Sequence, residues 1–358
     1  MSIFISFDFY GAGNVGDDLM LAGFLSAYGG KKPLSCLISR NVASQRIRFP
    51  QVTWREDTNH RTEIIQESEC LLGIGDTPFQ MSSGEWLLKK LLADAQVAAG
   101  KKIPCLMIGV GAESEVRTRP DLMKKILGQI DRIWTRDEFT SEILVKDCGF
   151  PAERLSTGGD LANIVLSTLF ASDAPTPAKD IDLGLCYYDE RINRGDIVVL
   201  RNFVREYSRD NSIQFFANET REEKDFEPQT YRKITGGFRR LIGKQKMTFF
   251  APDYQKGTLP DLVNHYAGYR TVLSSRYHAL LTAAWAGCRV VGHGRSSKLS
   301  ALTHELGIPL VENPITVSKL NEAVDKACVV DRGKLEEMSR RAGKAVAELQ
   351  ATMDEGLQ

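Results

Sequence analysis

Cationic side chains stand at the starts of several predicted helices of this sequence. Arg136 follows one predicted strand, and Lys298 stands where a later helix begins. Arg276 and His278 follow a serine pair that ends at Ser275, and either serine can cap the helix. Cations normally favour the C-terminus of a helix, because the helix dipole is positive at the N-terminus. We therefore expect these positions to bind an anion, shared between the cations and free backbone N–H groups.

Each of these cations also has a purely structural interpretation. Thr135 and Glu138 have the spacing of a capping box, which places Arg136 at the first helical position. An ion pair with Asp137 explains this arginine equally well. Lys298 alone is more often a solvated lysine than a ligand. The arginine and histidine in SSRYHALL are harder to explain structurally, because they lead an apolar helix that should be largely buried.

The residues of the turn near the N-terminus indicate a different kind of ligand chemistry. A G-x-G-x-x-G pattern runs from Gly11 to Gly16 between a predicted strand and a predicted helix, which is the context of a dinucleotide-binding turn. Asp17 and Asp18 follow at once, and their carboxylates would repel a diphosphate. A tight turn for strand–helix packing is one alternative. We favour another, in which Asn14 and these carboxylates bind the hydroxyls of a neutral polyol or remove a proton from one.

The elements that position these residues alternate regularly between strand and helix. Predicted strands cover residues 3–7, 33–39, 69–75, 103–111, 132–135, 154–158, 180–188, 212–217, 246–252, 270–275 and 288–294. Such alternation predicts an α/β fold with mostly parallel sheets covered by helices on both faces. A stretch rich in proline and small residues at 171–180 reads as a linker. The prediction is therefore two Rossmann-like doubly wound domains facing a cleft.

The expected domain boundaries follow from that linker. Residues 1–175 form the first Rossmann-like domain, 180–330 form the second, and 331–358 form an amphipathic helix that packs back on the first. The most irregular segment is 218–246, acidic first and basic later. We interpret it as a solvated surface insertion in preference to a lid over a ligand.

Composition excludes several classes of function. The 358 residues contain 46 Lys plus Arg and 46 Asp plus Glu, so there is no global field that would attract nucleic acid. No H-E-x-x-H motif or dense histidine–carboxylate cluster is present, so no metal site is expected. The cysteines form no C-x-x-C pair, no charged leader opens the chain, and no apolar run approaches 18 residues. We expect a cytoplasmic protein.

Short motifs recur in order from about residue 10 to 310. They are Asn14-x-Gly16-Asp17-Asp18, Arg136-Asp137-x-x-Thr140-Ser141-x-x-Leu144, Gly159-Asp160-Leu-Ala, and Ser275-Arg276-Tyr-His278-Ala279 followed by Ala-Gly-x-x-Val-Val and Lys298. Together they resemble the polysaccharide pyruvyl transferases. The resemblance implies a fold like that of the GT-B glycosyltransferases. It also implies phosphoenolpyruvate as donor and a pair of sugar hydroxyls as acceptor, giving a cyclic pyruvate ketal and inorganic phosphate.

Roles for the cations follow from the resemblance. It places Arg136, Arg276 and Lys298, together with Ser275, at the donor site, where they would hold phosphate and carboxylate. His278 would protonate the methylene carbon of phosphoenolpyruvate, which makes C2 electrophilic. No cofactor is implied besides phosphoenolpyruvate as co-substrate.

Acceptor residues are assigned partly by position and partly where the sequence departs from the family pattern. Asn14 and Gly16 lie in the N-terminal turn, and either Asp17 or Asp18 would orient or deprotonate a sugar hydroxyl. Asp76 and Gln80 stand where relatives carry a run of glycines, and Tyr187 stands where a strand usually ends in serine and arginine. These residues are the candidate acceptor site.

Partners and competing functions complete the expectations. We expect a saccharide or a glycolipid as the acceptor. Peripheral membrane association through the acceptor and assembly into a homo-oligomer are both compatible with the sequence. The main alternative is a GT-B glycosyltransferase that uses a nucleotide-sugar. An NAD(P)-dependent oxidoreductase is weaker, and a non-catalytic carbohydrate-binding relative would not need the cations.

Overall fold

The protein, described by a computed structural model, divides into two compact units. The description covers residues 2–6, 9–38, 40–56, 58–82, 84–171, 179–188, 194–221, 226–235, 247–294 and 296–355. One unit comprises Met1–Ala12, Asp17–Thr168 and Glu336–Gln358, and the other comprises Gly13–Gly16 and Leu169–Leu335. The turn Gly13–Gly16 therefore belongs, by its contacts, to the second unit, although it lies between two segments of the first.

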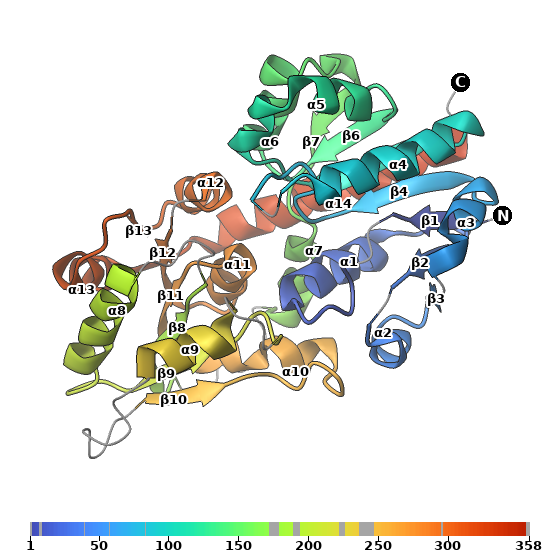
Figure 1. The fold of residues 1–358 in the computed structure, drawn as a ribbon. Coiled ribbons are helices and arrows are strands. Elements are labelled where there is room, and N and C mark those ends of the chain that lie inside the picture. Colours follow the sequence, from blue (N-terminus) through green and yellow to red (C-terminus); the bar gives the residue numbers. More distant parts are fainter. Residues whose placement is uncertain are drawn as a thin grey trace. The chain divides into compact units, whose positions relative to one another are not determined.

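The first unit is built on a seven-stranded sheet in the order β3-β2-β1-β4-β5-β6-β7 (Figure 1). Its strands are β1 (Ile3–Ile5), β2 (Leu34–Leu37), β3 (Val52–Arg55), β4 (Cys70–Ile74), β5 (Cys105–Val110), β6 (Arg132–Thr135) and β7 (Leu155–Thr157). All neighbouring strands are parallel. β4 and β5 are buried along their whole length, as expected for a parallel sheet covered on both faces.

Helices connect these strands in the expected alternation. They are α1 (Val15–Ala27), α2 (Val42–Arg48), α3 (Arg61–Gln66), α4 (Trp86–Gly100), α5 (Pro120–Leu127), α6 (Glu138–Glu142) and α7 (Ala162–Leu169), with short 3₁₀ turns at Thr58–His60, Ser114–Thr118 and Ala152–Arg154 and a π-helical turn at Ile143–Asp147. The long helix α14 (Arg332–Glu355) supplies the last covering element from its second half. Trp134 Nε1 donates to Glu348 Oε2 at 3.1 Å, and Ala345 packs so closely on Gly158 that a Cβ there would lie 2.7 Å from it.

The second unit contains a second sheet, in the order β10-β9-β8-β11-β12-β13, with β14 antiparallel to β12. The strands are β8 (Ile181–Cys186), β9 (Ile213–Phe216), β10 (Met247–Phe250), β11 (Tyr269–Ser274), β12 (Arg289–His293), β13 (Leu310–Val311) and β14 (Cys328–Val329). The helices are α8 (Arg194–Tyr207), α9 (Glu227–Thr235), α10 (Leu259–Val263), α11 (Tyr277–Trp285), α12 (Ser297–Leu306) and α13 (Val317–Asp325), with a 3₁₀ turn at Asn264–Gly268.

Both sheets have the strand order of a doubly wound fold. Strand order reverses beside β1 in the first unit and beside β8 in the second, so each sheet has one switch point. In such sheets ligands bind outside the carboxyl ends of the strands at that point. The predicted fold class, α/β with two Rossmann-like doubly wound domains, is confirmed.

Three local predictions are wrong. Asp137, not Thr135, caps α6: its side chain accepts from Thr140 N at 2.7 Å, so Arg136 lies before the cap instead of in the first turn. Neither serine before α11 is its N-cap, because that position is occupied by Arg276. The third correction concerns the segment 218–246, whose residues 222–225 and 236–246 lie outside the described residues. In the described part of this segment, about half of the α9 residues are buried, and Glu227 is fully buried. The prediction of a solvated surface insertion is therefore wrong for α9.

Candidate active site

The N-terminal turn is held by backbone hydrogen bonds to the segment that follows β9. Val15 N donates to Asn218 O at 3.0 Å, and Thr220 N donates to Gly13 O at 2.9 Å. Asn14 forms an antiparallel bridge with Glu219, and its side-chain oxygen accepts from Gly16 N at 3.0 Å. The turn is thus fixed as part of the second unit. The Asn14 side chain, a predicted acceptor ligand, shapes the turn itself.

Gly16 lies directly against His278. A Cβ at this position would lie 2.2 Å from Nδ1 and 2.6 Å from Cγ of the histidine, far inside van der Waals contact. His278 is the second residue of α11 and is only 9% exposed. The last glycine of the G-x-G-x-x-G pattern is therefore needed for close approach of an imidazole. Two motifs more than 250 residues apart meet at this contact.

The serine pair before α11 secures the loop that carries Arg276. Ser275 Oγ accepts from Tyr188 N at 2.6 Å and also bonds to Tyr188 O, which ties the carboxyl end of β11 to that of β8. Ser274 Oγ accepts from Arg276 N at 2.9 Å. The hydroxyl groups are therefore engaged with backbone, and Ser275 holds the site together at the switch point of the second sheet.

Arg276 forms a bidentate ion pair with Glu227 at the start of α9. Its Nε donates to Oε1 at 2.7 Å and its Nη2 to Oε2 at 3.1 Å, while Cζ lies 3.8 Å from the ring centroid of Tyr188. The glutamate is fully buried, and the arginine side chain is 17% exposed. Burial lowers the pKa of Arg276, but the charge and hydrogen bonds of Glu227 outweigh burial and raise it above its ordinary value. The guanidinium is permanently charged and held in one orientation.

A second carboxylate–arginine pair lies beside the first. Glu219 is 1% exposed and binds Arg221 through Nε and Nη2, both at 2.9 Å. Arg221 lies over the ring of Phe226, 4.4 Å from its centroid. Burial raises the pKa of Glu219 in spite of the arginine. Because Glu219 also bridges Asn14, this pair connects the opening turn to the neighbourhood of Arg276.

Arg136 occupies a comparable environment in the first unit. Its side chain is 2% exposed, and Nε lies 3.2 Å from Asp137 Oδ2 and 4.0 Å from Asp160 Oδ2. The ion pair with Asp137 that the sequence allowed is present. A Cβ on Gly111 would lie 2.4 Å from Nη2 of the arginine, so this glycine provides the space for the guanidinium.

The carboxylates after the opening turn differ in their surroundings. Asp18 is fully buried, forms an ion pair with Arg48, and accepts from Gln45 Nε2 at 3.2 Å. Asp17 is 7% exposed in the first turn of α1. Burial, followed by the nearby negative charges of Cys36, Asp17, Asp76 and Asp18, raises the pKa of Tyr10. Three predicted acidic residues therefore surround one tyrosine at the switch point of the first sheet.

Asp76 and Gln80 lie in the loop after β4. Gly75 and Asp76 both have positive φ, 65° and 61°, and Asp76 N donates to Met20 Sδ at 3.2 Å. Glu113 holds the far end of this loop, because its Oε2 accepts from the backbone N–H groups of Met81 and Ser82, both at 3.0 Å. Hydrogen bonds therefore hold both ends of this loop in place.

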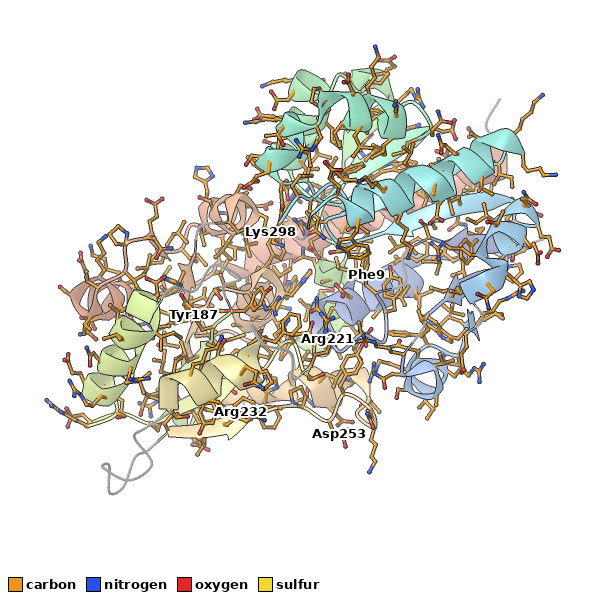
Figure 2. The ribbon with its side chains drawn as sticks, in the orientation of Figure 1. Phe9, Tyr187, Arg221, Arg232, Asp253 and Lys298 are labelled. Carbon is orange, nitrogen blue, oxygen red and sulfur yellow. The ribbon has the colours of Figure 1, made fainter. Side chains whose placement is uncertain are left out.

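Tyr187 and Lys298 occupy different places in the second unit (Figure 2). Tyr187 is fully buried in the core, where its ring stacks on His293 at 4.9 Å. A hollow of about 440 Å³ lies at the start of α12, the helix of Lys298, and it is lined by Gly294, Ser296, Ser300, Leu310, Glu312, Asn313 and Pro314. Tyr187 is therefore a core residue. Lys298 lies in the first turn of a helix, as expected, and that helix starts beside the hollow.

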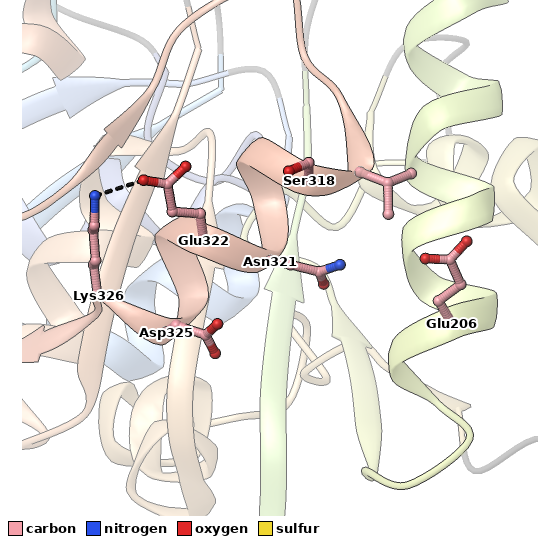
Figure 3. Close-up of a pocket in the computed structure, with 7 residues that line it drawn as sticks. Glu206, Ser318, Asn321, Glu322, Asp325 and Lys326 are labelled. Carbon is pink, nitrogen blue, oxygen red and sulfur yellow. Dashed lines mark hydrogen bonds and ion pairs between the residues drawn. The ribbon is translucent and has the colours of Figure 1, made fainter.

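A groove of the second unit contains none of the predicted residues. It lies between α8 and α13, has a volume of about 680 Å³, and is lined by Glu206, Val317, Ser318, Asn321, Glu322, Asp325 and Lys326 (Figure 3). Its only cation is paired with Glu322 at 2.6 Å. Within the described ranges, no group of three His, Cys, Asp or Glu side chains could hold a metal ion. Nor does any described helix have the length and apolar character needed to cross a bilayer.

Sequence reasoning missed the carboxylates that hold the arginines. Glu227, Glu219 and Asp160 are buried next to Arg276, Arg221 and Arg136. Asp160 could have been singled out from the sequence, because it belongs to the Gly159-Asp160-Leu-Ala motif. The two glutamates lie in a charged stretch where nothing distinguishes a buried carboxylate from a solvated one.

Comparison with known proteins identifies the family. The model of the polysaccharide pyruvyl transferase family matches residues 14–297, most of the chain. The chain belongs to the polysaccharide pyruvyl transferase family. The match begins at Asn14 and ends within the first turn of α12, so it includes both motifs that meet at the Gly16–His278 contact. Comparison with curated protein sequences finds no match.

Solved structures with a similar fold include UDP-GlcNAc 2-epimerases and a glycosyltransferase. UDP-GlcNAc 2-epimerase from Neisseria meningitidis, bound to UDP-GlcNAc, has 12% identity and a TM-score of 0.66, with 99% of each chain covered. The UDP-GlcNAc 2-epimerase of Methanocaldococcus jannaschii has 14% identity and a TM-score of 0.66, again with 99% of each covered. A glycosyltransferase from Rickettsia africae has 10% identity and a TM-score of 0.61, with 99% and 98% covered. At these identities the likeness extends to the fold, which is of the GT-B type, and no further.

Proposed function

We propose that this protein transfers the pyruvyl group of phosphoenolpyruvate to a sugar of a cell-surface or secreted glycan, or of its lipid-linked precursor, to form a pyruvate ketal. The observation that carries the proposal is the packing of His278 on Gly16 with Arg276 two residues away and fixed by Glu227. A proton donor and an immobilised guanidinium at one switch point suit a substrate that carries both a phosphate and a protonatable double bond.

Arg276 is equipped to hold the donor. A guanidinium has five N–H donors. Glu227 takes two of them, and five minus two leaves three with no partner among the described residues. Phosphate and carboxylate oxygens are the preferred acceptors of such donors. Lys298, in the first turn of α12, and Arg136 are the further cations that we assign to the donor.

The reaction then proceeds by proton transfer and addition. His278 protonates C3 of the enol phosphate, and a sugar hydroxyl adds to C2 while its proton goes to a carboxylate. The C2–O bond to phosphate breaks as a second sugar hydroxyl adds to C2 and gives its proton to the departing phosphate, which closes the ketal and releases inorganic phosphate. The cations stabilise the charge that builds up on the departing phosphate.

The two carboxylates after the opening turn take separate parts in this proposal. We assign Asp17 as the base or the hydroxyl-orienting group, whereas Asp18 forms an ion pair with Arg48 and accepts from Gln45. Asp18 fixes the first turn of α1, which also contains Asp17. Asp76 and Gln80 contribute acceptor contacts from the loop that Glu113 holds.

Ligand-dependent thermal stability tests the donor class. Phosphoenolpyruvate should raise the melting temperature, whereas UDP-GlcNAc and NAD(P) should not. Arg276→Lys should abolish the shift, because lysine cannot use one edge for Glu227 and another for a ligand. Arg332→Lys is the control, since Arg332 also stacks on an aromatic ring of the second unit, 4.4 Å from the centroid of Trp285. Stabilisation by UDP-GlcNAc alone would favour the sugar-nucleotide alternative suggested by the fold neighbours.

Catalysis is tested by phosphate release. Wild-type protein, phosphoenolpyruvate and a panel of oligosaccharides should yield inorganic phosphate and an acid-labile pyruvyl adduct in equal amounts. His278→Asn should reduce the rate by at least about a hundredfold, as expected for loss of a general acid. Turnover of the variant at the wild-type rate would exclude His278 as the acid.

A further inference from the structure

The guanidinium of Arg276 is restrained on one edge and on one face. Glu227 occupies the edge formed by Nε and Nη2, with distances of 2.7 and 3.1 Å. Tyr188 covers a face at 3.8 Å, and the ring of Phe226 lies 5.7 Å from Cζ. A planar group held in this way presents its remaining donors, on Nη1 and the outer side of Nη2, in one direction.

The glutamate that holds this edge is itself enclosed. Glu227 is fully buried and, among the residues that the structure describes, accepts from the arginine and, weakly, from Cys186 Sγ at 3.5 Å. Its charge is therefore poorly screened by solvent, and an anion bound to the far edge of the guanidinium lies within a few ångströms of it. The carboxylate of Glu227 repels that anion, whereas the guanidinium of Arg276 attracts it.

We propose that Glu227 is the positioning residue of the anion site, which orients Arg276 toward the ligand and limits how tightly the site holds phosphate. The inference rests on the proposed function in that the anion is the phosphate group of the donor and, later, the released product. An arginine without a paired carboxylate would bind the released phosphate more tightly and slow its dissociation. The pair lets Arg276 stabilise a departing phosphate and then release it.

Binding of inorganic phosphate tests the charge. Isothermal titration at low ionic strength should show phosphate binding to Glu227→Gln at least threefold tighter than to wild type, although kcat falls. Asp94→Asn is the matched control: Asp94 forms a buried bidentate pair with Arg61 in the other unit, with side chains 7% and 16% exposed. It loses the same kind of pair and should leave phosphate affinity within twofold of wild type. A role in folding alone would weaken phosphate binding or leave it unchanged, and either result for Glu227→Gln overturns the proposal.

Glu227→Asp tests the positioning role and serves if the glutamine variant does not fold. It keeps the charge but shortens the side chain by one methylene, so the guanidinium must shift. Phosphate affinity should stay within twofold of wild type, while kcat/KM for phosphoenolpyruvate should fall at least tenfold. Wild-type kcat/KM in this variant, or no phosphate binding to any form, refutes the inference. Tighter phosphate binding in Glu227→Gln without any pyruvyl transfer by wild type would refute the proposed function and leave this inference standing.

Discussion

Replacement of Gly16 by alanine is the most direct perturbation of the contact between the opening turn and α11. The new Cβ would lie 2.2 Å from Nδ1, 2.6 Å from Cγ and 2.9 Å from Cβ of His278. Ordinary contacts between such atoms are about 3.4 Å or longer, so the turn or the imidazole must move by roughly 1 Å. Neither can move easily, because the turn is bonded to Asn218 and Thr220 and the histidine begins a buried helix.

The magnitude follows from the size of that displacement. Overpacking of this kind costs about 1–3 kcal/mol in the free energy of unfolding. A misplacement of about 1 Å at a reacting group can cost about a hundredfold in rate. We therefore expect Gly16→Ala to lower kcat/KM by about a hundredfold while the melting temperature falls by only a few degrees.

The assay is steady-state phosphate release combined with thermal unfolding, and Gly343→Ala is its control. A Cβ on Gly343, within α14, meets no atom within 4 Å, so this variant should keep its activity and gain about 0.5–1 kcal/mol of stability. The His278→Ala background removes the contacts at 2.2 and 2.6 Å and keeps only the contact at 2.9 Å to Cβ, so Gly16→Ala should destabilise that background less. Unchanged kcat/KM in Gly16→Ala, or an equal loss of stability in both backgrounds, would refute the argued contact.

Four further substitutions test other parts of the structure. Gly111→Ala should raise the KM for phosphoenolpyruvate at least about tenfold, since its Cβ would displace the guanidinium of Arg136, 2.4 Å away; an unchanged KM would remove that arginine from the donor site. Asp18→Asn should lose about 3–5 kcal/mol of stability in urea unfolding, because a buried arginine is left without its carboxylate, whereas Asp17→Asn should lose activity with less effect on stability. Burial lowers the pKa of His265 to about 3, so the unfolded chain binds more protons below pH 6.5 and stability should fall by about 2 kcal/mol between pH 7 and pH 5. His265→Phe should flatten that dependence, and a slope that survives it would assign the effect to another group.

The fold could be predicted because its signals are local. Alternating apolar strands and amphipathic helices are legible within windows of ten to fifteen residues. The predicted strand at 132–135 coincides with β6, and that at 154–158 contains β7. β3 was missed since only Val52 and Trp54 of its four residues point to the core, in a run too short to stand out.

Candidate residues could be named from the sequence, but their contacts could not be predicted from it. Both Thr135 and Asp137 are good caps, and only the extended backbone at Asp137 decides between them. Ser275 reads as a cap in the sequence, yet its hydroxyl bonds to Tyr188, 87 residues earlier. Glu227 lies in a charged stretch of the sequence, and its burial depends on an ion pair with Arg276, 49 residues later. Long-range pairing of this kind leaves no trace in local spacing.

Helix α14 imposes an order on the biogenesis of this protein. Its second half, which bonds to Trp134 through Glu348 and packs on Gly158, leaves the ribosome only after residues 169–335 have been made. At about 5–20 residues per second, the nascent first unit waits on the order of ten to thirty seconds without its last covering helix. During that interval an apolar surface that is buried in the finished protein is open to chaperones and to neighbouring nascent chains. Completion of the first unit is therefore a late event, and the unit synthesised second is free to fold before it.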